Sequence, residues 1–250
     1  MVSLEFAVVS AVSTLRSQGL CASALELAFL SLQDDGDQGR LWELAGLLHA
    51  DLGDFDAARQ ALETASSLVP LEPEGRFTLA KCYAANGQAD LAREMYWSLL
   101  EWNETPQDLL LKIASHFDCL GRPDLSVHAC RKASLRDQQV ARPFYEMAYY
   151  MRRCHYPPHL IESMARHAVR LDPDFQLYRV GLAVFLHSID RNHDAYDVIC
   201  DLTPRQLKSV TCACCLDQLR AVCEHCGDLP RAAACRARLL HIRQQQTQAS

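Results

Sequence analysis

Cysteine is the residue type in this chain most suited to metal binding or redox chemistry. The sequence of 250 residues contains twelve cysteines, and six of them lie within residues 212–235. Thiolates and histidine nitrogens are the ligands that zinc prefers, so a metal-binding or redox-responsive site is one interpretation of this segment. The residues best placed to form such a site are Cys223, His225, Cys226 and Cys235.

Spacing argues against one site that uses the whole cysteine run. If one helix runs from Cys212 to Cys226, its ends lie about 21 Å apart at a rise of about 1.5 Å per residue. A single zinc ion, with Zn–S distances of about 2.3 Å, cannot bridge that separation. Cys223 also shares a helix face with Leu219. We therefore favour burial as small apolar residues for these cysteines, with the metal or redox site as the alternative.

No other residues form a recognisable catalytic pattern. The sequence contains no phosphate-binding glycine loop, no G-x-S-x-G elbow and no H-E-x-x-H motif. The histidines are dispersed, and none lies beside a plausible nucleophile in the sequence. We expect a protein that is not an enzyme and that binds no cofactor.

The elements that position these side chains belong to a pattern that repeats seven times, about every 34 residues. The clearest copy contains Trp42, Gly46, Gly53, Ala58 and Pro70. A period of this length is typical of helix pairs that stack into a solenoid.

Glycines mark the turn between the two helices of most copies, because glycine adopts a positive φ without strain. These turn glycines are Gly19, Gly53, Gly87, Gly121 and Gly227. In the fifth and sixth copies the same position holds His155 and Asp190, so these two turns are the weakest part of the pattern.

This pattern resembles the tetratricopeptide repeat family over roughly residues 5–246. The resemblance implies an all-α, right-handed superhelical solenoid of about seven antiparallel helix pairs. We expect one domain over residues 1–250. Its repeats are expected near residues 5–38, 39–72, 73–106, 107–140, 141–175, 176–209 and 213–246.

In that family, the first helices of successive pairs line a concave groove that binds a peptide or a partner helix. In the fifth copy, the helix face opposite the core carries tyrosine and arginine, two residue types enriched at binding hot spots. The predicted groove residues are Arg142, Tyr145, Tyr149, Arg152 and Arg153, joined from other copies by Phe77, Lys81, Leu111, Val184 and His187. They would form an apolar channel with a basic centre, although scattered surface residues are the competing interpretation.

Function is expected to follow from that groove. We expect a non-catalytic scaffold or adaptor that binds a peptide or protein carrying apolar and acidic groups. Family members that hold heat-shock chaperone tails use a clamp of lysines and asparagines, but the asparagine positions here hold Leu47, Lys81 and Ser115. The sequence therefore does not predict that kind of co-chaperone.

Composition limits the other classes of partner. The net charge of −6 disfavours general nucleic-acid binding, and no apolar run approaches the length of a membrane helix. The apolar first residues follow no lysine or arginine, unlike a secretory signal. Many cysteines suit a reducing compartment, so we expect a cytoplasmic protein. The apolar first helix leaves self-association open.

Overall fold

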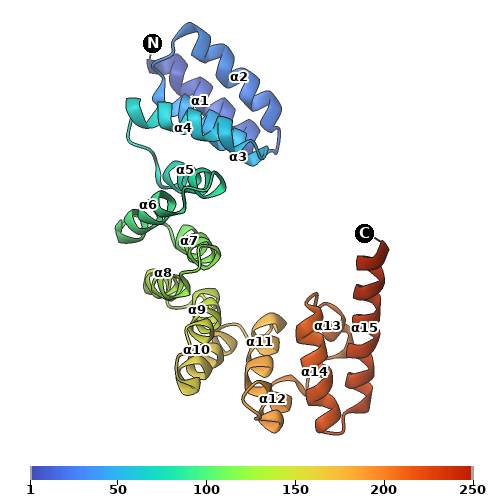
Figure 1. Ribbon diagram of the computed structural model, residues 1–250. Helices are drawn as coiled ribbons and strands as arrows, with labels where there is room; N and C mark the ends of the chain where they lie inside the picture. The colour runs from blue at the N-terminus through green and yellow to red at the C-terminus, as the bar shows by residue number, and fades with distance from the viewer. Residues whose placement is uncertain (1, 249–250) are drawn as a thin grey trace. The chain divides into compact units, whose positions relative to one another are not determined.

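The computed structural model describes residues 2–248, and within that range every regular element is a helix. This confirms the expected all-α fold. The chain divides into two compact units, Met1–Lys132 and Ala133–Ser250, whose helices are labelled in Figure 1. The single domain over residues 1–250 stays a prediction. None of the helices described is long and apolar enough to cross a membrane.

The first unit is built from consecutive helix pairs, and the boundary between the units falls within its last helix. The pairs are α1 (Val2–Ser17) with α2 (Cys21–Asp34), α3 (Gly39–Asp51) with α4 (Phe55–Leu68), α5 (Pro73–Ala85) with α6 (Ala89–Glu101), and α7 (Gln107–Cys119) followed by α8 (Pro123–Arg136).

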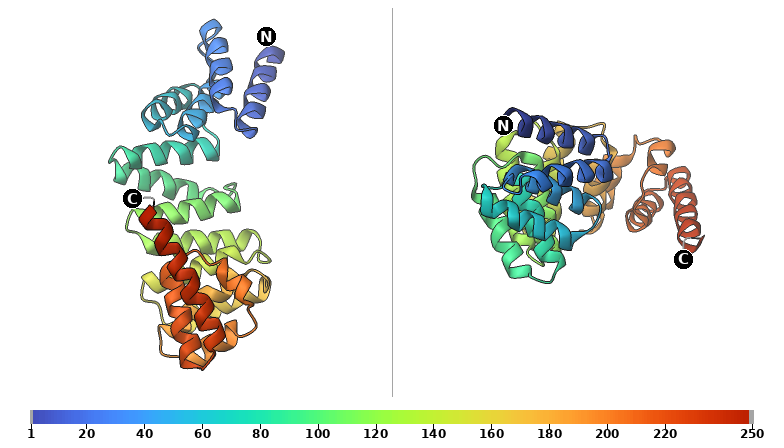
Figure 2. Two further views of the ribbon diagram at one scale, coloured as in Figure 1. Left: turned by 90° about the vertical axis from the view of Figure 1, so that its right-hand side faces the viewer. Right: turned by 90° about the horizontal axis from the view of Figure 1, so that it is seen from above.

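The second unit continues the same scheme. Its pairs are α9 (Arg142–Arg153) with α10 (Pro158–Leu171), α11 (Gln176–His187) with α12 (Asn192–Ile199), and α14 (Ala213–His225) with α15 (Leu229–Gln248). In Figures 1 and 2, α14 and α15 lie side by side, as do α1 and α2 in the first unit. The described residues thus contain the seven pairs that the repeat predicts.

Small residues let the two helices of a pair approach closely. A Cβ atom on Gly46 of α3 would lie only 2.5 Å from the side chain of Leu62 on α4 and 3.1 Å from the carbonyl oxygen of Ala58. Ala58 and Leu62 are fully buried. Any larger residue at position 46 would have to push the helices apart, which explains the glycine in the repeat pattern.

The predicted turns have the expected backbone conformation. All five turn glycines have positive φ, from 73° at Gly121 to 85° at Gly53. The two substitutes adopt the same conformation, with φ of 56° at His155 and 62° at Asp190. The left-handed conformation is unfavourable for residues with a Cβ, although Asp and His tolerate it better than most. The turn geometry is therefore kept in the fifth and sixth pairs at some cost in stability.

A short helix that the repeat pattern did not predict, α13 (Pro204–Lys208), lies between the sixth and seventh pairs. The hydroxyl of Thr203 accepts a hydrogen bond from the Gln206 N–H, and the Gln206 side chain accepts one from the Thr203 N–H. This reciprocal pair is a capping box. Leu207 is fully buried, so α13 anchors the connection that leads to α14.

Candidate functional site

Helix α9 places a tyrosine and two arginines on one exposed face. On one side of the helix, Met147 and Met151 are buried. On the other side Tyr149 is 54% exposed, and Arg152 and Arg153 are also exposed. Residues three and four apart are neighbours on a helix surface. We call Tyr149, Arg152 and Arg153 the α9 surface.

Tyr145 does not belong to this exposed set, although the sequence predicted it as an open groove residue. Its ring is half-buried, and its centroid lies 4.9 Å from that of Tyr178. A Cβ atom on Gly181 would come within 2.5 Å of the Tyr145 ring. Burial raises the pKa of Tyr145 to about 12, and the nearby Cys215 and Cys212 thiols contribute to that rise. Tyr145 therefore joins α9 to α11.

Arg142, at the start of α9, is exposed but already has a partner within the helix. Its Nε donates to Glu146 Oε1 at 2.6 Å. Exposed pairs of this spacing contribute only about 0.3–0.5 kcal/mol. The predicted role of Arg142 as a partner contact stays a prediction, and the pairing partly neutralises its charge.

The expected exposed apolar channel is wrong. Phe77 is 8% exposed, Leu111 1% and Val184 7%. All three side chains are therefore packed inside the protein and are not open to a partner. The ring of Phe77, for example, lies 5.6 Å from that of Tyr96 and 5.0 Å from that of His116, measured between centroids. Residues predicted to meet a partner are instead part of the core.

Lys81 and His187, the remaining predicted groove residues, are half-buried and engaged within their own units. The Lys81 ammonium lies 4.9 Å from the centroid of the Phe55 ring, which is cation–π geometry. His187 Nδ1 lies 2.6 Å from Asn192 Oδ1. Both side chains thus have intramolecular partners, and their contact with another protein remains a prediction.

The four residues of the metal alternative are not brought together as ligands. Cys223 and Cys235 are fully buried, and burial raises the pKa of these thiols to about 12 and about 11. Cys226 follows the end of α14, with its Sγ 3.7 Å from His193 Nδ1. The ring of His225 lies 5.5 Å from that of His193. No three of the four have ligand atoms within mutual reach in the described part of the chain.

A different group of cysteines lies at the start of α14. The Sγ atoms of Cys212, Cys214 and Cys215 all lie within 4.8 Å of one another, and no other Cys, His, Asp or Glu group of this kind occurs among the residues whose side chains the structure describes. We call these three residues the thiol triad. The sequence pattern does not reveal the triad, because it predicts a helix that continues through Cys212. That residue is the N-cap of α14 and lies outside the helix.

Hydrogen bonding makes the three thiols of the triad unequal. Burial acts to raise the pKa of Cys212, but hydrogen bonds from Cys214 and Cys215 outweigh it and lower that pKa. The same contact with Cys212 raises the pKa of Cys214. Burial, followed by the effect of Cys212, raises the pKa of Cys215 to about 12.

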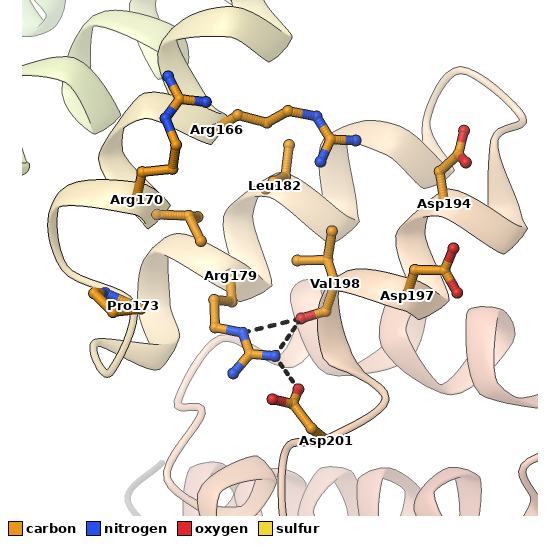
Figure 3. A pocket seen from close by; sticks show the side chains of 10 residues that line it. Arg166, Arg170, Pro173, Arg179, Leu182, Asp194, Asp197, Val198 and Asp201 are labelled. Atoms are coloured by element: carbon orange, nitrogen blue, oxygen red, sulfur yellow. Dashed lines mark hydrogen bonds and ion pairs between the residues drawn. The ribbon is translucent and has the colours of Figure 1, made fainter.

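A cavity of about 580 Å³ lies between α10, α11 and α12 in the second unit (Figure 3). Arg166 and Arg170 from α10 line one side, and Asp194 and Asp197 from α12 line the other. The repeat pattern did not predict this cavity, because the residues that line it come mostly from the second helices of two pairs. The opposite charges on two successive second helices were the available signal.

The charged groups around this cavity are largely satisfied within the chain. Arg179 donates to the carbonyl oxygen of Val198 at 3.0 and 2.7 Å and pairs with Asp201. Arg166 pairs with Glu162 at 2.8 Å. The cavity is therefore better explained as a junction between two helix pairs than as a ligand site.

Comparisons with known proteins agree with this architecture. A family model described as a tetratricopeptide repeat matches residues 49–110. No curated protein matches the sequence.

Solved structures resemble the chain over most of its length. One is the C-terminal part of a TPR repeat-containing protein from Cytophaga hutchinsonii, which is 16% identical, with 94% of this chain and 95% of that chain covered and a TM-score of 0.70. Another is a tetratricopeptide repeat protein from Parabacteroides merdae, 15% identical, with 95% and 93% covered and a TM-score of 0.64.

A third similar structure is YrrB, described as a TPR protein with an unusual peptide-binding site. It is 17% identical, with 73% of this chain and 90% of that chain covered and a TM-score of 0.56. Identities this low relate the chains by fold alone.

Proposed function

We propose that this chain, a tetratricopeptide repeat protein, is a non-catalytic scaffold that binds a peptide or partner protein at the α9 surface. The observation that carries the proposal is the exposure of Tyr149 beside two exposed arginines, on a helix whose other face is buried. The general role of an interaction scaffold fits the fold. The choice of surface and of ligand is our own inference.

The residue types suit protein recognition. Tyrosine offers a large, partly apolar surface that loses little conformational entropy on binding, and tyrosine and arginine dominate interface hot spots. The guanidinium groups of Arg152 and Arg153 can each donate two parallel hydrogen bonds to a carboxylate. The ligand should therefore combine an apolar anchor for Tyr149 with acidic side chains for the arginines.

Packing behind the α9 surface supports the same proposal. Met147 and Met151 fix the helix against the core, and Tyr145 fixes it against Gly181. Because the backbone is ordered before the ligand arrives, little of the binding free energy is spent on arranging this side of the interface. We place this activity in the cytoplasm, where the many cysteines of the chain would stay reduced.

Binding of an acidic, apolar peptide library to the purified full-length chain tests the proposal. The double variant Tyr149→Ala/Arg152→Ala should weaken the best peptide about tenfold or more, which corresponds to about 1.4 kcal/mol or more.

The matched control is Arg205→Ala/Leu240→Ala. Arg205 is exposed on α13, and Leu240 on α15 is 54% exposed, the same fraction as Tyr149. This control should bind as the wild type does. Equal binding by wild type and the Tyr149→Ala/Arg152→Ala variant would exclude the α9 surface.

A further inference from the structure

The thiol triad at the start of α14 has a geometry that the interaction function does not use. The Sγ atoms of Cys212 and Cys214 lie 2.8 Å apart, and the Cys215 N–H donates to the Cys212 Sγ at 3.4 Å. The third sulfur, that of Cys215, lies within 4.8 Å of the other two. Three thiols thus converge from a stretch of four consecutive residues.

Packing does not account for these cysteines. Cysteine is among the residue types most often buried, and Cys223 and Cys235 follow that rule at 0% exposure. Cys212 and Cys214 are exposed instead, and Cys215 is half-buried. Core packing therefore does not explain why positions 212 and 214 hold cysteine.

The backbone on both sides of the triad is held in place. Before it, Val210 is buried and its carbonyl oxygen accepts a hydrogen bond from Arg238 Nε at 3.4 Å. After it, Leu216 is fully buried in the first turn of α14. The backbone that carries the three thiols is therefore held in place, as a metal site requires.

The sulfur separations in the triad are of the size found around one metal ion: 2.8 Å between Cys212 and Cys214, and no more than 4.8 Å for any pair. At a Zn–S distance of about 2.3 Å, two sulfurs on a tetrahedral ion lie roughly 3.8 Å apart. To reach that arrangement, the Cys212 and Cys214 sulfurs must move apart by about 1 Å. Small rotations about their Cα–Cβ bonds provide such a movement. Soft thiolate ligands favour zinc and copper(I) over hard cations such as Mg²⁺ and Ca²⁺.

We propose that Cys212, Cys214 and Cys215 bind a single soft metal ion, Zn²⁺ or copper(I), through their three sulfur atoms. In the part of the chain that the structure describes, no fourth His, Cys, Asp or Glu ligand atom joins the group. The outer side of the ion is then open to solvent, because Cys212 and Cys214 are exposed. With zinc, a water molecule completes the coordination; copper(I) is satisfied by three thiolates.

Metal titration of the reduced, full-length protein tests this proposal. Zinc is titrated in competition with a chromophoric zinc chelator, and copper(I) in a separate anaerobic titration with a copper(I) chelator. The wild type should bind about one equivalent of one or both ions. The triple variant Cys212→Ser/Cys214→Ser/Cys215→Ser should lose that equivalent.

A matched triple variant controls for nonspecific thiol binding. Cys21, Cys119 and Cys200 lie outside the core, so Cys21→Ser/Cys119→Ser/Cys200→Ser should keep the full equivalent. Helical circular dichroism of all three proteins checks that each is folded. With cobalt(II) as the probe, the wild type should also show sulfur-to-metal charge-transfer absorption that the triad variant lacks.

The proposal is overturned if the wild type competes with neither chelator, or if the folded triad variant binds as much metal as the wild type. Equal losses in the two triple variants would also contradict it, because they would show diffuse thiol binding. Neither result bears on the α9 surface, whose test uses peptides and no metal.

Discussion

Helices α5 and α9 begin the third and fifth repeats of the same pattern but use equivalent positions differently. Phe77 and Tyr145 occupy one equivalent position, and Lys81 and Tyr149 occupy another, one helical turn later. Phe77 is buried and Tyr145 half-buried, whereas Lys81 is half-buried and Tyr149 exposed. The earlier position therefore joins a first helix to the next pair, and the later one can reach solvent.

Substitutions at these two positions should differ most in their effect on the free energy of unfolding. Phe77→Ala should destabilise the protein by roughly 3–5 kcal/mol, because it removes a buried ring that packs against Tyr96 and His116. Tyr149→Ala should change stability by no more than about 0.5 kcal/mol. Urea unfolding followed by circular dichroism measures both. If Phe77→Ala leaves stability unchanged, the earlier position is not a packing position.

The contact between Tyr145 and Gly181 tests the same assignment within the second unit. Gly181→Ala should cost about 1–3 kcal/mol, since the new Cβ would lie 2.5 Å from the tyrosine ring. In the background of Tyr145→Ala, the same substitution should cost much less, because the clash is gone. A double-mutant cycle measures this coupling. Additive effects would mean that Tyr145 does not pack against α11.

In the turns we expect a smaller difference in stability, between glycine and the His155 and Asp190 that replace it. His155→Gly and Asp190→Gly should each raise stability by about 0.5–1 kcal/mol, because glycine relieves the strain of positive φ.

Gly53→Ala is the opposite substitution, which places a Cβ at a turn position with positive φ. An added Cβ meets nothing within 4 Å at Gly53, so only its φ of 85° opposes the substitution. It should lower stability by about 1 kcal/mol. Thermal unfolding of the three variants compares them directly. A stabilising Gly53→Ala would contradict the proposed role of positive φ.

The helix pairs could be predicted because their signals are local. A turn glycine such as Gly53 and the small residue Gly46 mark the end and the packing face of a helix within one repeat. Helix α13 was missed, because five residues are too few to show a helical period. The Thr203–Pro204–Gln206 capping pattern was nevertheless present in the sequence.

The site was harder to predict, because exposure depends on the neighbouring repeat. A helical wheel finds the side opposite a helix's own partner, which identified Tyr149 correctly as exposed. It cannot show that tertiary packing buries Leu111 and Val184. The thiol triad was missed for a related reason, since the wheel assumes a continuous helix and Cys212 lies just outside α14.

Site-specific photo-crosslinking, in the cells that naturally make this protein, tests most directly whether a partner protein binds at the α9 surface. A benzophenone amino acid replaces Tyr149 in one variant and Leu240 in another, since both positions are 54% exposed. After irradiation, the account predicts that one defined protein is joined to position 149 and is absent from crosslinks at position 240. The same protein joined equally to both positions, or to position 240 alone, would contradict a partner site on α9.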